Sequence, residues 1–540
     1  MKRFKKVLAL LISAAVVLSM TACADSEGGT NNNGGSGDSG SGTTTTAGSF
    51  EEATAPPIDE NAETGTVKYL TYETNFESDS AKMLALFDER YGGQIEVDSS
   101  VTSEDYFTKL ATYISTGDSP DLVRYEWKVF PHGMSYNMFT PLDDYINLDD
   151  PLWSGIKEVA EQFAYNGKHF YVPYHIGCSF ALNYNNRVLE ENGISDPMTL
   201  VQSNTWTWSA FEDMLKRWKD IDPNHISYNG VGGMSFVLTT GQKAIEITNG
   251  EIINNLRNAD IQRCMSWLEN MRKNGLLGAT AEQQAAGVPN GYVHPGEAFV
   301  DGNLLFLGME PTWTFTSAKE TLDGQSIPND IKFIPFPRDD QANAYYQGTD
   351  TFGYMIPAGA QNIKGAMDWI NLLRTEEIDP DNIAKDKAEA IKEGPDYFPI
   401  CPNADCNDTV NPDSKGRHTY TEEENEAGVT VCPNCGTARR EKYKVVWSEE
   451  QYDLLMEMRG EGDRFTLLFD NCYGFSSDVS QLFQGGDTPI LDGPVFNDVT
   501  YTAAVESKWN VLEGYLQPYR DRMAADARGE EITTTPPEDA

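Results

Sequence analysis

The chain is poor in positive charge and in the residues that most often perform catalysis. Its 540 residues contain 41 lysines and arginines against 83 aspartates and glutamates, a formal net charge of -42 at pH 7, and only six histidines. This balance disfavours nucleic acid and anionic membrane surfaces as partners. The sequence also lacks a G-x-S-x-G, an H-E-x-x-H and a G-x-x-x-x-G-K-[ST] motif. We therefore expect a protein that is not an enzyme.

The first 23 residues combine a charged start, a short apolar run and an exit of small residues. The apolar run over residues 7–18 is too short to span a bilayer comfortably, and the order of the parts predicts a secretory signal peptide over residues 1–22. The ending Met20-Thr21-Ala22-Cys23 resembles a bacterial lipobox. The resemblance implies that Cys23 becomes the mature N-terminus of a lipoprotein, carrying diacylglycerol and palmitate. An ordinary secretory signal with a chance cysteine is the alternative.

Almost nothing in residues 23–65 can be buried. The segment contains GGTNNNGGSGDSGSGTTTTAGS and APPIDENAE, so no apolar core offsets the entropy lost on ordering it. About 40 such residues form a coil with an r.m.s. reach of about 35 Å. A lipidated cysteine, a disordered tether and a large body predict a protein anchored by lipid to the outer, extracytoplasmic face of the cell membrane. The polar residues 526–540 predict a disordered tail.

The body, from about residue 66 to 525, begins with alternating strand and helix patterns. These predict strands over Thr66–Tyr72, Gln94–Ser99 and Pro120–Tyr125, and helices over Asp79–Tyr91 and Ser103–Thr116. This order indicates an α/β fold with a parallel sheet and right-handed crossovers. Such sheets bind ligands at the carboxyl ends of their strands, which here carry Tyr72, Glu73, Tyr125, Glu126 and Trp127. Of Tyr125 and Trp127, we expect one to face the ligand and the other to pack.

Several later segments match a known pattern in order and spacing. They are YFTKLATYISTGDSPDLV, FYVP, LNYNNRVLEENG, TWSAFEDML, EAFVDGNLLFLGMEPTW, FIPFP and GYMIPAGAQNIKGAMDWINLL, between about residues 66 and 373. Together they resemble family 1 extracellular solute-binding proteins, the maltose-binding-protein class of ABC-importer lipoproteins.

The resemblance implies a class II, periplasmic-binding-protein-like fold. Two α/β lobes are joined by crossing strands and close by a hinge on a ligand held between them. The first lobe takes residues 66–174 and 338–376, and the second takes 178–336 and 377–525. The resemblance further implies a monomer that binds a carbohydrate, such as an oligosaccharide, and delivers it to the permease subunits of an ABC importer.

Further candidate ligand-binding residues lie in these segments or close to them: Tyr174, Glu310, Trp313 and Asp350. Trp313 stands where members of the family commonly place a sugar-stacking aromatic, and a place in the core is the alternative. We expect the carboxylates of Glu73, Glu126 and Asp350 to accept hydrogen bonds from ligand hydroxyls. Aromatic faces would supply apolar contact.

Two other functions remain open at this point. The same anchor and tether suit a surface carbohydrate-active enzyme or an adhesin. A receptor of the same class can instead carry a non-sugar solute such as a peptide, a polyamine or an anion. The acidic and aromatic lining that we expect disfavours anions most.

Half of the eight cysteines form two close pairs late in the chain. These pairs, C-x4-C and C-x2-C, are Cys401, Cys406, Cys432 and Cys435. Four thiolates close a tetrahedral structural site, so residues 398–445 resemble a small zinc ribbon inserted into the second lobe, with no open position for catalysis. Disulfides, or a rubredoxin-like iron site, are alternatives. We expect buried free thiols at Cys178, Cys264 and Cys472.

Overall fold

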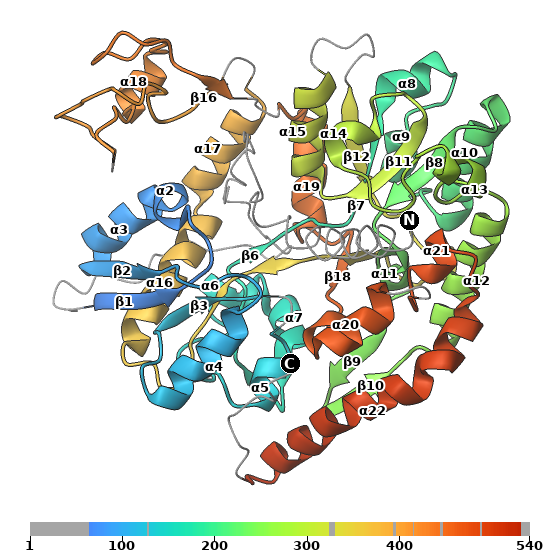
Figure 1. Cartoon of the computed structure of the whole chain (residues 1–540), viewed down its shortest axis with the longest axis horizontal. Coiled ribbons are helices and arrows are strands. Elements are labelled where there is room, and N and C mark those ends of the chain that lie inside the picture. The colour runs from blue at the N-terminus through green and yellow to red at the C-terminus, as the bar shows by residue number, and fades with distance from the viewer. Residues whose placement is uncertain are drawn as a thin grey trace, which may run out of the picture.

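The computed structural model describes residues 64–530 except 127–128, 323–329, 393–395, 414, 443–445 and 486–488. The predicted signal peptide, the lipidation of Cys23 and the tether up to residue 63 therefore lie outside the described residues, as do residues 531–540. Two four-stranded sheets with flanking helices dominate the described part of the chain (Figure 1). Within that part, no helix is both long enough and apolar enough to cross a bilayer.

The first sheet arises from the N-terminal strand–helix repeats. Its order is β15-β3-β1-β2, formed by β1 (Gly65–Leu70), β2 (Gly93–Asp98), β3 (Leu122–Arg124) and β15 (Tyr354–Met355). β1 pairs in parallel with β2 and β3, while β15 is antiparallel to β3. The crossover helices α3 (Ala81–Tyr91) and α4 (Tyr106–Thr116) each end at a left-handed glycine, Gly92 and Gly117. The predicted parallel α/β arrangement is confirmed.

A helix from much later in the chain completes the core of this sheet. α16 (Ile363–Ile378) packs against β1 and α3. Its Trp369 is fully buried, with the ring centroid 5.3 Å from that of Phe87 and 6.1 Å from that of Phe76. Residues 64–124 and 354–378 therefore share one hydrophobic core.

The second sheet has the order β12-β7-β11-β8. Its strands are β7 (Ala181–Asn185), β8 (Ile226–Gly230), β11 (Leu304–Met309) and β12 (Ile331–Pro335). β7 and β11 are buried along their whole length, as is typical of strands covered on both faces. β8 and β11 run in parallel with Gly230 opposite Gly308, so their carboxyl ends lie at the same edge. α10 (Trp208–Ile221) and α12 (Ala259–Lys273) belong to this half.

The chain crosses between the sheets more than once. β6 (His175–Ile176) pairs in antiparallel fashion with β14 (Thr351–Phe352), and β13 (Tyr346–Gly348) pairs in parallel with β18 (Thr466–Leu468). These short strands connect β7 and β12 of the second sheet to the parts of the chain that form the first. Together with the two sheets, they confirm the predicted two-lobe class.

The last helix contacts segments from both halves. α22 runs from Tyr501 to Ala527. Near its start, the Tyr501 hydroxyl donates to the carbonyl oxygen of Leu256 at 2.7 Å. Near its end, Asn166 Nδ2 donates to the carbonyl oxygen of Met523 at 2.8 Å.

The remaining elements are short. In the first half they are α2 (Phe76–Asp79), α5 (His132–Ser135), α6 (Pro151–Ser154), α7 (Lys157–Ala160), η1 (Glu161–Phe163), β4 (Ala164–Tyr165) and β5 (Lys168–His169). Later in the chain they are α8 (Asn186–Glu191), α9 (Met198–Gln202), α11 (Gly233–Leu238), β9 (Ile245–Thr248), β10 (Glu251–Asn254), α13 (Ala281–Ala285), α14 (Pro295–Ala298), α15 (Pro311–Leu322), α19 (Glu449–Met458), η2 (Cys472–Gly474), α20 (Ser477–Gln484) and α21 (Gly493–Phe496).

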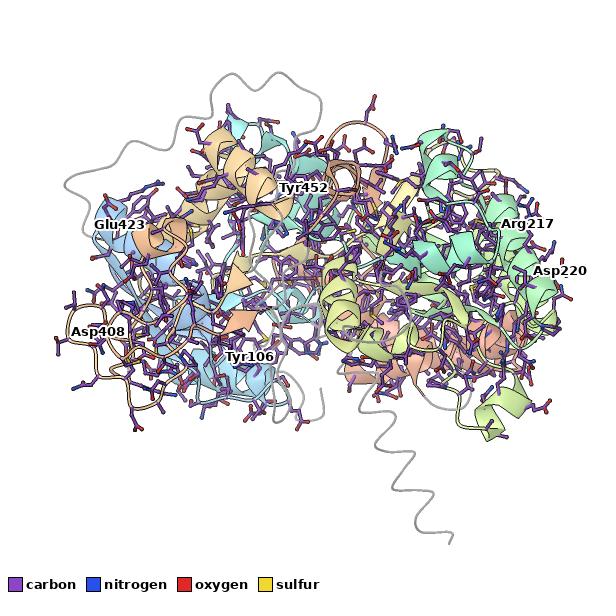
Figure 2. All side chains as sticks on the ribbon, turned by 90° about the horizontal axis from the view of Figure 1, so that it is seen from above. Tyr106, Arg217, Asp220, Asp408, Glu423 and Tyr452 are labelled. Carbon is purple, nitrogen blue, oxygen red and sulfur yellow. The ribbon has the colours of Figure 1, made fainter. Side chains whose placement is uncertain are left out.

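A small cysteine-bearing insertion separates α17 (Pro380–Ala390) from α19. It contains β16 (Asp396–Tyr397), α18 (Glu422–Glu426) and β17 (Glu441–Lys442), and antiparallel pairing of β16 with β17 closes its base. In both views it lies on the side of the first sheet, near α2 (Figures 1 and 2). Figure 2 shows Asp408 and Glu423 of the insertion on the same side as Tyr106 of α4, away from Arg217 and Asp220 of α10.

Candidate ligand-binding site

Three of the predicted residues meet at the carboxyl ends of β1 and β3. Arg124, the last residue of β3, forms an ion pair with Glu73, and its Nε lies 3.7 Å from Glu126 Oε1. The Tyr72 hydroxyl donates to the same Glu126 oxygen at 2.8 Å. The structure therefore joins a guanidinium, two carboxylates and a phenol in one network, which we call the Arg124 network. It lies at the edge where parallel sheets bind ligands.

The Arg124 network is largely shielded from solvent. The side chains of Arg124, Glu73 and Glu126 are 16%, 15% and 9% exposed. Burial alone disfavours the charged form of each group, so each charge depends on its opposite partner. One cation and two carboxylates leave a net negative charge, which favours ligand groups that donate hydrogen bonds and disfavours anions.

Arg124 is not among the candidates predicted from the sequence, although the sequence carries a signal for it. Arg124 is a charged residue at the end of the apolar strand LVR, directly before Tyr125 and Glu126. A buried cation requires a carboxylate partner, and two glutamates stand at the same predicted edge. Pairing across that edge would have identified Arg124 as the centre of the network.

Of the two aromatic residues expected at the end of β3, only Tyr125 lies in the described part of the chain. Tyr125 is 6% exposed, and its ring stacks on that of Tyr171 with centroids 3.9 Å apart and packs against Phe163. This is the packing role that the sequence analysis expected for one member of the pair. Trp127 lies outside the described residues.

Tyr174 and Asp350 lie beside the crossing strands. The Tyr174 ring is nearly parallel to that of Tyr354, with centroids 6.1 Å apart, and burial raises the pKa of Tyr174 to about 12. The N–H of Ser179 donates to Asp350 Oδ1 at 3.1 Å, and the N–H of Gly177 donates to the Asp350 carbonyl at 2.9 Å. A Cβ at position 177 would overlap the Asp350 carboxylate, so this close approach requires glycine. Asp350 thus ties one crossing segment to the other.

Glu310 and Trp313 lie at the carboxyl edge of the second sheet. Glu310 follows β11, and its carboxylate accepts the N–H groups of Thr312 and Trp313, at 2.9 and 2.5 Å, in the first turn of α15. Burial raises the pKa of Glu310, and these two hydrogen bonds oppose that rise. Trp313 is partly buried, and its ring meets His294 edge-on with centroids 5.5 Å apart. The described candidates thus form three groups, one on each sheet and one at the crossing.

The four paired cysteines form one compact cluster. Their Sγ atoms all lie within 4.8 Å of one another, with 3.5 Å between Cys401 and Cys435 and 3.8 Å between Cys406 and Cys432. A tetrahedral zinc site with Zn–S bonds of about 2.3 Å separates its sulfurs by about 3.8 Å, so the cluster fits such an ion. These separations exceed the S–S bond length of about 2.05 Å.

The surroundings of the cluster also suit thiolate ligands. Asn434 Nδ2 donates to Cys406 Sγ at 3.3 Å, and hydrogen bonding with Thr437 lowers the pKa of Cys435 to about 6. The N–H of Gly436 donates to the Cys432 carbonyl, which closes the turn between the last two cysteines. Cys178, Cys264 and Cys472 are buried and not disulfide-bonded, as predicted.

Two sheets joined by crossing strands, with polar and aromatic residues at their carboxyl edges, define a two-lobe solute-binding protein. A family model described as bacterial extracellular solute-binding protein matches residues 82–386, more than half of the chain, and the chain belongs to this family. The family comprises extracellular binding proteins rather than enzymes, which confirms the predicted class. A comparison with curated protein sequences finds no match.

Solved structures show the same fold. The sugar-binding protein MalE of Xanthomonas citri is 14% identical, has a TM-score of 0.51, and is aligned over 85% of this chain and 98% of its own. The ABC transporter associated binding protein of B. animalis subsp. lactis, solved with beta-1,6-galactobiose, is 14% identical with a TM-score of 0.50 and the same coverage. At this level of identity the comparison shows the fold alone.

Proposed function

We propose that the protein binds a carbohydrate outside the cell and delivers it to the permease subunits of an ABC importer. The observation that carries this proposal is the Arg124 network at the carboxyl edge of the first sheet, in a chain of the solute-binding family. Two neighbours in fold support the ligand class, because one is a sugar-binding protein and the other was solved with a galactobiose.

The chemistry of the candidate residues supports a neutral, hydroxyl-rich ligand. Glu73 and Glu126 can accept hydrogen bonds from ligand hydroxyls, while Arg124 can donate. On the second sheet, Trp313 offers an aromatic face for the apolar side of a sugar ring. We propose the same binding role for Tyr174, Glu310 and Asp350, with the lobes closing by a hinge at the crossing strands.

The proposed domain organisation has two discontinuous lobes. Residues 66–174 and 338–376 form the first, and residues 178–336 and 377–525 form the second; the insertion over residues 398–445 interrupts the second in sequence but lies on the side of the first sheet. The packing of α16 on β1 and α3 supports the return of the chain to the first lobe. We further propose that the protein is a monomer attached to the outer face of the cell membrane through lipidated Cys23.

Calorimetry on an oligosaccharide panel, combined with product analysis, tests the proposed function. We expect saturable binding of at least one neutral sugar and no change in that sugar on prolonged incubation. Hydrolysis of a panel sugar would replace the receptor with a surface carbohydrate-active enzyme. Binding of peptides or polyamines but no sugar would retain the receptor and change its cargo.

We also propose that Cys401, Cys406, Cys432 and Cys435 hold one structural zinc ion. The Sγ separations support this assignment, and a closed set of four thiolates leaves the metal no position for substrate. The ion would supply the insertion with the stability that its small apolar cluster, around Tyr420 and Val429, cannot provide.

A further inference from the structure

We infer that Asp492 is a ligand-binding residue of the second lobe, whose Oδ2 accepts a hydrogen bond from a hydroxyl of the bound solute. This inference rests on the proposed function and adds a residue that the sequence analysis did not consider. It also explains the motif Gly230-Val231-Gly232-Gly233, which the proposed function leaves unexplained.

The backbone places Asp492 at the edge that bears Glu310 and Trp313. Gly230 ends β8 opposite Gly308 of the neighbouring strand β11, and the N–H of Val231 donates to the Gly308 carbonyl at 2.8 Å. The N–H of Gly233, three residues beyond the strand end, donates to Asp492 Oδ1 at 3.0 Å. Glu310 follows Gly308 by two residues, so both carboxylates lie beside the carboxyl ends of adjacent parallel strands.

Two glycines make room for the segment that carries Asp492. A Cβ at Gly232 would overlap the carboxylate of Asp492, and a Cβ at Gly233 would overlap the carbonyl of Leu491. The φ of Gly232 is -89°, which other residues adopt, so space rather than backbone conformation requires glycine here. The Asp492 carboxylate therefore occupies the space that a side chain at position 232, just beyond the strand end, would need.

The carboxylate is oriented but not neutralised. Gly233 holds Oδ1, and the hydrogen bonds found among the described residues leave Oδ2 without a partner, while the residue remains partly exposed. Burial raises the pKa of Asp492 to about 6, and the hydrogen bond from Gly233 opposes the rise. α11 carries no titratable side chain; on β8, burial and then the charge of Asp492 raise the pKa of Tyr228. An ionised acceptor without a cation suits a neutral donor such as a sugar hydroxyl and repels an anion.

The test compares wild type with Asp492→Asn and with the matched control Asp498→Asn, an exposed aspartate six residues away. The amide introduced by Asp492→Asn keeps an oxygen for the Gly233 N–H and replaces Oδ2 with a donor. Thermal shift is measured side by side with maltotriose, beta-1,6-galactobiose, spermidine, a tripeptide and citrate. Calorimetry at pH 7.5 and 5 then follows for each compound that binds.

We expect Asp492→Asn to weaken sugar binding about ten- to a hundredfold at pH 7.5, with an unchanged unfolding temperature in the absence of ligand. Wild-type affinity should fall as pH drops through about 6, because protonated Asp492 loses its acceptor role. Glu310 contributes its own pH dependence to both proteins, so the difference between the two profiles isolates Asp492.

Equal affinities of wild type and Asp492→Asn for a compound that binds would overturn this inference and leave the proposed function standing. Binding of spermidine or the peptide, but no sugar, would overturn the proposed sugar ligand. The Asp492 inference would then be judged on that compound, and a wild type that binds nothing would overturn both.

A second measurement uses Gly232→Ala, which should weaken binding in the wild-type background but cost little more affinity in the Asp492→Ala background, where the overlapping atoms are absent.

Discussion

Replacing Arg124 with methionine should destabilise the protein strongly, and more at neutral than at acid pH. The substitution leaves Glu73 and Glu126 largely buried without their shared cation. At 3.7 Å and an effective dielectric constant of about 20, one such pair attracts with about 4.5 kcal/mol. Removing one partner of a buried pair typically costs about 3–5 kcal/mol, so we expect a loss of about 3–4 kcal/mol in the free energy of unfolding at pH 7.5.

The sign of the pH effect follows from the charge left behind. The penalty comes from burying negative charge without its cation, and protonation of a carboxylate removes that charge, so acid should relieve the penalty. Urea titrations of wild type, Arg124→Met and Arg124→Lys at pH 7.5 and 4.5, followed by tryptophan fluorescence, measure this. Arg217→Met, on the exposed face of α10, is the matched control and should change stability by less than about 0.5 kcal/mol. A loss below about 1 kcal/mol for Arg124→Met at pH 7.5, or the same loss at both pH values, would refute the reasoning.

Three further predictions address the second lobe, the metal and the anchor. Trp313→Ala should weaken sugar binding by about 1–3 kcal/mol while the fold stays intact; a large fall in unfolding temperature with unchanged affinity would instead place Trp313 in the core. Protein purified without chelator should contain about one zinc per chain, bound less tightly at acid pH because thiolates take up protons, and four thiols that react only after the metal is removed. Oxidised cysteine pairs without metal would establish disulfides in its place. Cys23→Ala should release the protein into the medium or leave it unprocessed, as fractionation and mass spectrometry of the N-terminus show; unchanged membrane attachment without a lipid contradicts the lipobox interpretation.

Much of the fold could be predicted because hydrophobic periodicity is a local property. The strands and helices up to residue 125 follow from alternation and helical spacing, and the structure moves their ends by a few residues. The left-handed glycines that end α3 and α4 are visible in the sequence as Gly92 and Gly117. The four-cysteine cluster could also be predicted from the sequence, because two closely spaced pairs of cysteines in one insertion are typical of a shared metal site or of disulfides.

The candidate site was predicted only in part, because its decisive contacts join residues far apart in the chain. Arg124 was missed because its partners lie on both sides of a crossover, and Asp492 because Gly233 lies more than 250 residues before it. Trp208, at the start of α10, depends on a distant partner in the same way: it is 4% exposed and stacked on Trp267 with centroids 4.5 Å apart. The local sequence pattern indicates candidate residues, whereas contacts between distant segments determine the role of each residue.

The antiparallel pairing of β16 with β17 makes the cysteine-bearing insertion a self-contained cassette. Asp396 stands opposite Lys442, so the chain leaves the body and returns to it at neighbouring points, about 5 Å apart as in any antiparallel pair. The cut ends left by removing everything between these two residues can be rejoined by a short turn, without moving α17 or α19. A module built in this way can be acquired, lost or exchanged in a single genetic event while the two-lobe body keeps its shape.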